Sequence, residues 1–195
     1  RRAIATRMRA RHPRIPTQWL MTDERMGWAL WDALERVPRG QGVIFRHYSL
    51  EICARRNLYL QVAKVARRRR LMLIVAGGDG LGPGNAGIHG RSAKRARGIL
   101  TWPAHNLPEL IAANRAKADM VLISPVFATR SHLGTRTLGL ARAASLARQA
   151  DMPAIALGGI QKRHSRHLKS AGFYGWAAIG AWIEPEIHDV GGRRP

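Results

Sequence analysis

Short apolar runs alternate with longer amphipathic stretches along most of this 195-residue chain. Eight runs have the length and composition of buried strands, and most of the stretches between them have helical spacing. The predicted strands are 19–22, 43–46, 71–76, 86–89, 99–102, 120–124, 154–157 and 175–179. The predicted helices are 24–36, 50–69, a weak 92–97, 107–117, 138–149, 161–171 and a short start after Gly180. Only the link between the third and fourth strands, GGDGLGPGN, is too rich in glycine to hold a helix.

This alternation predicts an α/β fold in which helices cover a parallel sheet, and eight such units can close into a (β/α)8 TIM barrel. An open doubly wound sheet is the alternative. Such barrels typically need about 250 residues, so the helices and loops here must be compact. We predict one domain over residues 15–195, preceded by a mobile basic tail, residues 1–14, with six arginines and no acid.

The chain carries 33 Lys and Arg against 12 Asp and Glu, a net charge of +21 that favours anionic ligands. Aromatic residues make up only 6% of the chain and no nucleic-acid motif is present, so phosphorylated small molecules are favoured over RNA. The single cysteine, Cys53, excludes an intrachain disulfide and points to the cytoplasm. No apolar run approaches the roughly 18 residues of a membrane span, so no membrane partner is expected. A homo-oligomer remains open.

The strand ends indicate where a ligand would bind, because barrel active sites lie at the carboxyl ends of the strands. Gly158 and Gly159 follow the seventh strand, and Gly180 and Ala181 follow the eighth. Barrels often bind phosphate between these two loops, where unhindered backbone N–H groups face the anion. The sequence therefore predicts phosphate binding there, with tight turns as the alternative explanation of the glycines.

Three further residues follow predicted strands and are candidates for catalysis. Arg46 ends the second strand, where a guanidinium suits bidentate phosphate contact. His89 and His105 follow the fourth and fifth strands and could carry protons near neutral pH. The alternatives are a solvated arginine and histidines that serve packing or hydrogen bonding.

Four carboxylates lie near the predicted catalytic rim, namely Asp23, Glu24, Glu51 and Asp79. No two of them form a recognisable metal pair, so no metal ligands are assigned. Any magnesium would be held mainly by the ligand or by Asp79.

Three segments resemble the thiamine phosphate synthase family, which includes a related thiazole tautomerase. They are ADMVLISPVFATRSHLGTRTLGL (118–140), PAIALGGI (153–160) and AGFYGWAAIGAW (171–182). The resemblance implies a (β/α)8 barrel and a thiazole phosphate held after strands six, seven and eight. It places Thr129, Ser131 and His132 in the phosphate site beside the glycines. Ser131 stands at a family threonine and His132 at a family lysine.

The segments GIHG and VIFRHY place His89 and Arg46 on a family histidine and arginine. Ile44 and Tyr48 replace the family's Gln and Lys beside that arginine. Pro125 stands where the tautomerase branch has its histidine.

The pyrophosphate side departs from the family most. Ala76–Gly77 replaces its Asn-Asp, the basic run Arg91–Arg97 replaces an acid, and Pro103 stands near an expected serine. Both family carboxylates for magnesium are thus absent. Arg46, Arg91 and Arg130 are candidates to supply the missing positive charge.

The resemblance implies a transferase that joins hydroxymethylpyrimidine diphosphate to thiazole phosphate and releases pyrophosphate. Three alternatives remain: a tautomerase acting through His89 or His105, a phosphate-ligand binder without catalysis, and a basic RNA-binding protein. The family cofactor would be magnesium, although its carboxylate ligands are missing.

Overall fold

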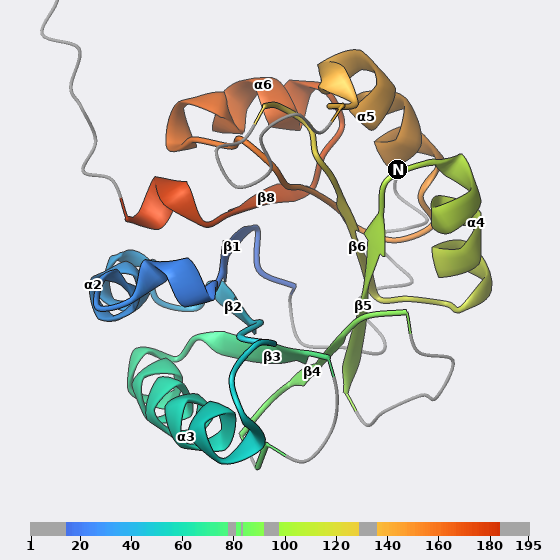
Figure 1. The fold of residues 1–195 in the computed structure, drawn as a ribbon. Coiled ribbons are helices and arrows are strands. Elements are labelled where there is room, and N and C mark those ends of the chain that lie inside the picture. The colour runs from blue at the N-terminus through green and yellow to red at the C-terminus, as the bar shows by residue number, and fades with distance from the viewer. Residues whose placement is uncertain (1–14, 78–80, 83, 92–97, 129–135, 184–195) are drawn as a thin grey trace, which may run out of the picture.

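The computed structural model describes residues 15–77, 81–82, 84–91, 98–128 and 136–183. The predicted tail 1–14 and the weak helix 92–97 lie outside these residues. Eight parallel strands form a closed barrel in the order β1 to β8, each paired with its neighbour in sequence and β8 paired with β1. The TIM-barrel prediction is confirmed, and the open doubly wound alternative is wrong. Figure 1 shows helices α2 to α6 outside the ring of strands.

The strands lie close to their predicted positions: β1 (Gln18–Met21), β2 (Gly42–Phe45), β3 (Met72–Ala76), β4 (Gly87–His89), β5 (Ile99–Ala104), β6 (Met120–Ile123), β7 (Ala154–Ala156) and β8 (Gly175–Ala178). The largest difference is β5, which extends past Trp102 to include Pro103 and Ala104. His105 therefore follows its strand directly.

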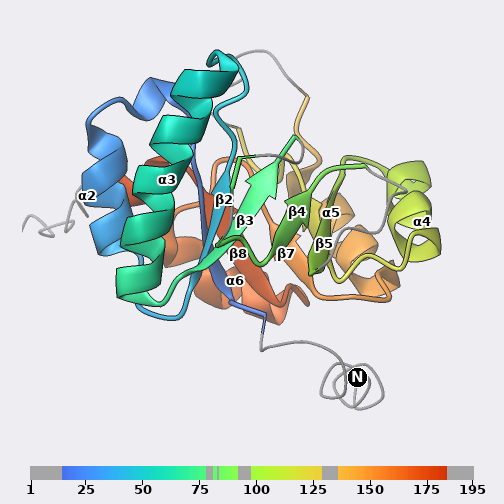
Figure 2. The same ribbon diagram turned by 90° about the horizontal axis from the view of Figure 1, so that it is seen from below.

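The α-helices are α2 (Ala29–Arg36), α3 (Ile52–Arg69), α4 (Leu107–Arg115), α5 (Gly139–Gln149) and α6 (Ser165–Ser170), and short 3-10 turns are η1 (Glu24–Met26), η3 (Lys162–His164) and η4 (Gly180–Trp182). The single helix predicted over 24–36 is divided into η1 and α2. Gly27 lies between them with a φ of 48°, a positive value that favours glycine and departs from helical geometry. The described residues of the β3–β4 link contain no helix, as the glycines predict. Figure 2 shows α2 and α3 side by side along the outside of the barrel.

Two apolar layers stabilise this arrangement. The inner layer fills the barrel with side chains such as Trp19, Ile44, Ile74, Met120 and Ile155, all fully or almost fully buried. Trp19 lies against Gly42, where a Cβ would come within 2.1 Å of the indole ring. The outer layer lies between strands and helices. Side chains therefore fill the inside of the barrel as far as the structure describes it.

Among the described residues, none of the helices combines the length and the apolar character needed to cross a bilayer.

Candidate active site

A cavity of about 670 Å³ opens at the carboxyl ends of the strands. Its lining residues belong to seven of the eight strands or to the segments that follow them: Met21, Arg46, Tyr48, His89, Pro103, His105, Leu122, Ser124, Pro125, Arg136, Leu138, Leu157, Gly158, Gly159, Ile160, Ala178, Ile179 and Gly180. The volume suits a small organic ligand. The structure thus brings the three predicted catalytic candidates and three of the predicted phosphate-binding glycines to one cavity.

The loop after β7 forms one wall of this cavity. Gly158 and Gly159 have φ angles of 95° and 62°, a conformation that favours glycine. The carbonyl of Gly158 accepts a hydrogen bond from Phe127 N (3.0 Å), which ties the loop to the segment after β6. Among the described residues, the N–H groups of both glycines have no acceptor. These N–H groups are therefore available to an anionic ligand.

The loop after β8 adds Gly180 to the same wall, at the first position of η4. A Cβ at Gly180 would meet no atom within 4 Å, so this side of the cavity is open. Ala181 follows inside η4 and does not line the cavity. The three residues predicted from the segment after β6, Thr129, Ser131 and His132, lie outside the described residues.

Arg46 enters the cavity from the end of β2, and its backbone is held at both polar groups. Its N–H donates to Thr22 Oγ1 at 3.1 Å, and its carbonyl accepts from Arg55 Nη2 at 3.3 Å. Its guanidinium lies 5.7 Å from the centre of the Tyr48 ring, a cation–π distance. The position of Arg46 is thus fixed by neighbours from β1 and α3.

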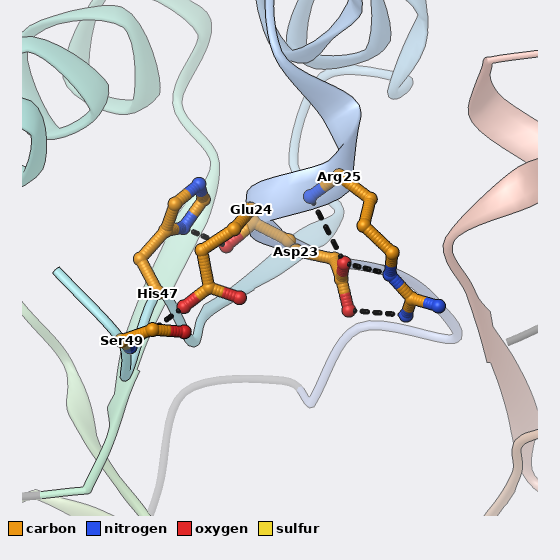
Figure 3. A network of polar contacts seen from close by, with 6 residues as sticks. Asp23, Glu24, Arg25, His47 and Ser49 are labelled. Atoms are coloured by element: carbon orange, nitrogen blue, oxygen red, sulfur yellow. Dashed lines mark hydrogen bonds and ion pairs between the residues drawn. The ribbon is translucent and has the colours of Figure 1, made fainter. Parts of the chain in front are cut away.

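A network of polar contacts lies next to the hydrogen bond between Arg46 N–H and Thr22 (Figure 3). The Thr22 hydroxyl accepts from Arg46 N–H and forms a hydrogen bond with His47 Nδ1 at 3.0 Å. Burial lowers the pKa of His47, which favours its neutral ring. Asp23 binds the Arg25 guanidinium through both oxygens, at 2.6 and 2.7 Å. Glu24 accepts a hydrogen bond from Ser49 N–H at 2.9 Å.

His89 lines the centre of the cavity at the end of β4. Its side chain is almost fully buried, and its Nδ1 lies 2.8 Å from Thr101 Oγ1. Burial and, second, the positive charge of Arg46 lower the pKa of His89 to about 4. The imidazole is therefore neutral at pH 7, whereas the sequence predicted a ring that titrates near neutrality. Whether it moves a proton during a reaction stays a prediction.

His105 lies at the exposed rim and lines the same cavity. Its Nδ1 lies 2.7 Å from the carbonyl oxygen of Ser124, so Nδ1 carries the hydrogen and donates it. Nε2 is then the acceptor nitrogen of the neutral ring. Its backbone N–H donates to Glu109 Oε2 at 2.7 Å, which fixes the residue at the start of α4.

Sequence reasoning missed three residues that shape the site. Arg136 and Tyr48 line the cavity, and Arg55 lies behind it, buried under Tyr48. By contrast, Arg91, a candidate for the missing positive charge, does not line the cavity and instead pairs with Glu109 at 2.7 Å. Arg130 lies outside the described residues.

The described residues do not fit a magnesium ion. None of them form a cluster of three or more metal-ligating side chains. Asp23 forms an ion pair with Arg25, and Glu24 accepts a hydrogen bond from the Ser49 backbone. Glu51 caps α3 by accepting from Cys53 N–H. Asp79 lies outside the described residues.

The fold and the cavity define a (β/α)8 barrel protein with a candidate ligand site at the carboxyl ends of the strands. The family model of thiamine monophosphate synthase matches residues 22–182. The chain therefore belongs to the thiamine monophosphate synthase family.

Individual relatives are more distant. The putative thiamine-phosphate synthase 2 of Aquifex aeolicus is 31% identical over 86 residues, which cover 44% of this chain and 46% of that protein. The thiamine-phosphate synthase of Chlamydia caviae is 35% identical over 88 residues, or 43% of this chain and 40% of that protein. The chain thus spans less than half the length of these two curated relatives.

Among solved structures, the thiamine phosphate pyrophosphorylase of Pyrococcus furiosus has a TM-score of 0.71 and 20% sequence identity, and the match covers 87% of this chain and 88% of that one. At this identity the likeness is evidence for the fold alone.

Proposed function

We propose that this protein is a thiamine phosphate synthase-type transferase that joins hydroxymethylpyrimidine diphosphate to thiazole phosphate. The bond from the pyrimidine methylene carbon to the diphosphate oxygen breaks, and its electron pair leaves with pyrophosphate. The lone pair of the thiazole nitrogen forms the new carbon–nitrogen bond, and the positive charge ends on the thiazolium ring. Both substrates are phosphorylated small molecules, for which the cytoplasm is the expected compartment.

The main support is that arginines and glycines line one cavity in a member of this family. The arginines are Arg46 and Arg136, and Gly158, Gly159 and Gly180 form what we call the glycine wall. In the proposal, the N–H groups of Gly158 and Gly159, with the loop of Gly180 and Ala181, bind the thiazole phosphate. Arg46, which lines the same cavity, stabilises the charge that develops on the leaving pyrophosphate. No step is assigned to magnesium, because the described residues do not fit it.

The transferase is favoured over the tautomerase for two reasons. The named relatives are thiamine-phosphate synthases, and the residue at the tautomerase histidine position, Pro125, lines the cavity without an ionisable group. His89 and His105 are proposed to orient substrate by hydrogen bonding, His89 as a neutral ring at pH 7.

The test is an assay of pyrophosphate release from the two substrates, with and without magnesium, for three proteins. Removing one oriented donor to developing charge costs about 10² to 10³ in rate, so Arg46→Ala should lose that much relative to the wild type. Arg56→Ala is the matched control, because Arg56 is an exposed arginine of α3 and does not line the cavity. A wild type without turnover at any magnesium concentration would refute the transferase and leave a phosphate-ligand binder.

A further inference from the structure

Arg55 lies in the first turn of α3, behind the cavity wall, and is only 8% exposed. Its Nη2 donates to the carbonyls of Ala76 at 2.5 Å and Arg46 at 3.3 Å, at the ends of β3 and β2. Its guanidinium lies 5.8 Å from the Phe45 ring centre and 5.7 Å from that of Tyr48. One buried cation thus joins the ends of two strands to the Tyr48 ring.

The Tyr48 ring occupies the space next to Gly77. A Cβ at Gly77 would lie 2.4 Å from Tyr48 Cε1 and 2.8 Å from Cδ1, so no larger residue fits while the ring is there. Gly77 also has a φ of 72°, which favours glycine. Tyr48 as a whole is 52% exposed. The Tyr48 ring therefore packs against Arg46, Arg55 and Gly77, and we call this group of residues the corner.

This corner holds two guanidinium groups, those of Arg46 and Arg55. Asp23, whose charge interacts with that of Arg46, is itself ion-paired with Arg25. Among the described residues, no carboxylate forms an ion pair with Arg46 or Arg55, and Arg55 Nε is buried without a hydrogen-bond partner. A buried unpaired cation is costly, and an anion placed in the adjoining cavity would offset that cost.

We propose that Arg55 is a positioning residue that holds Arg46 and Tyr48 so that this corner binds a pyrophosphate-type anion without a divalent metal. Arg55 fixes the carbonyl of Arg46 and supports the Tyr48 ring, on which the Arg46 guanidinium also lies. Arg46 is the group that touches the anion. The identity of the anion rests on the proposed function, whereas its binding can be measured without turnover.

The experiment is calorimetric titration of the full chain with inorganic pyrophosphate in EDTA, repeated in excess magnesium. The wild type should bind in EDTA, and magnesium should not tighten binding. A charged hydrogen-bonding contribution of about 1.5 to 3 kcal/mol corresponds to about 10- to 100-fold, so Arg55→Gln should weaken pyrophosphate binding by at least about tenfold. Arg56→Gln removes an exposed arginine from the next position of α3 and should change the affinity less than about twofold.

Measuring the affinity for a second ligand distinguishes a positioning role of Arg55 from general damage to the fold. Arg55→Gln should leave the affinity for thiazole phosphate, expected at the glycine wall, unchanged, whereas a disrupted barrel would weaken both ligands. If Arg55→Gln does not fold, Tyr48→Ala replaces it, because Tyr48 is an exposed residue whose ring can be removed with less damage to the fold. Its loss should weaken pyrophosphate binding alone, while Tyr48→Phe keeps the affinity. Binding of pyrophosphate by the wild type only with magnesium, or an equal loss in Arg56→Gln, would overturn the proposal.

Discussion

The buried imidazole of His89 should make the protein sensitive to mild acid. Burial is the larger cause and the charge of Arg46 the smaller one, and together they lower the pKa of His89 from 6.5 to about 4. The folded state therefore favours the neutral ring more than the unfolded state does. The stability that His89 contributes is complete above the unfolded pKa and is lost as the pH falls from 6.5 toward about 4.

The size of this effect follows from proton linkage. Between about pH 7.5 and about pH 4.5, the two pKa values give a loss of about 2.5 kcal/mol in the free energy of unfolding. For a chain of this length, about 1 kcal/mol corresponds to about 2 to 4 °C in Tm. The His89 contribution is thus about 5 to 10 °C, large enough to measure.

The assay is urea unfolding of the wild type and His89→Gln at both pH values. Other titrating groups, such as His47 and the carboxylates, are common to both proteins and cancel in the comparison. The wild type should lose about 2.5 kcal/mol more than the variant on acidification. An equal loss in the two proteins would mean that His89 is not held neutral, and the arrangement at the cavity centre would need revision.

Three further predictions concern the glycine wall, the start of the chain and the network of Figure 3. Gly159→Ala should lower Tm by several degrees in calorimetry, because Gly159 has a φ of 62° and a Cβ there would lie 2.3 Å from Ala128 O; Gly180→Val should keep its Tm and weaken thiazole phosphate binding, and an unchanged affinity would place the anion elsewhere. A chain that begins at Ile15 should have the same Tm as the full chain by circular dichroism. A chain that begins at Gln18 lacks the carbonyls of residues 15–17, which accept hydrogen bonds from Tyr174, Trp19 and Trp176, and should lose about 3 kcal/mol of stability. An equal Tm for the two shortened chains would contradict this. The hydrogen bond from Arg25 lowers the pKa of Asp23, so its contribution is present above pH 3.8 and lost as the pH falls below it; Asp23→Asn should therefore be less stable than the wild type at neutral pH in urea, and a difference that persists undiminished in strong acid would contradict the charge-based explanation.

The barrel could be predicted because its strands are buried on both faces. Continuous apolar runs such as MVLI (120–123) and MLIVA (72–76) are typical of that burial, and the amphipathic stretches between them fix the count. Gly27 indicated a break between η1 and α2, but the helical spacing of apolar residues on both sides of it favoured one continuous helix. In the structure, the backbone conformation of Gly27 interrupts the helix despite that spacing.

The glycine wall and Arg46 could also be predicted from the sequence, because their position after a barrel strand places them at the cavity. Arg55 could not be predicted in this way. It belongs to a helix with several other arginines, among them Arg56, Arg67 and Arg68, and sequence alone does not show which of these turns inward. Arg91 is the opposite case, since it follows a strand closely and yet pairs with Glu109 outside the cavity. Strand order places the backbone, whereas side-chain direction depends on tertiary neighbours.

Two departures from the family pattern that are 29 positions apart in sequence belong to one packing arrangement. Tyr48 stands at a family lysine and Gly77 at a family aspartate, and in the structure the ring of the first fills the space of a side chain at the second. With the ring in this place, a carboxylate side chain at position 77 would collide with it. Among the described residues, no carboxylate forms an ion pair with the adjoining cations, Arg46 and Arg55. A corner that had only decayed would have no reason to keep a guanidinium buried at that cost, so the arrangement favours a site rebuilt around arginine.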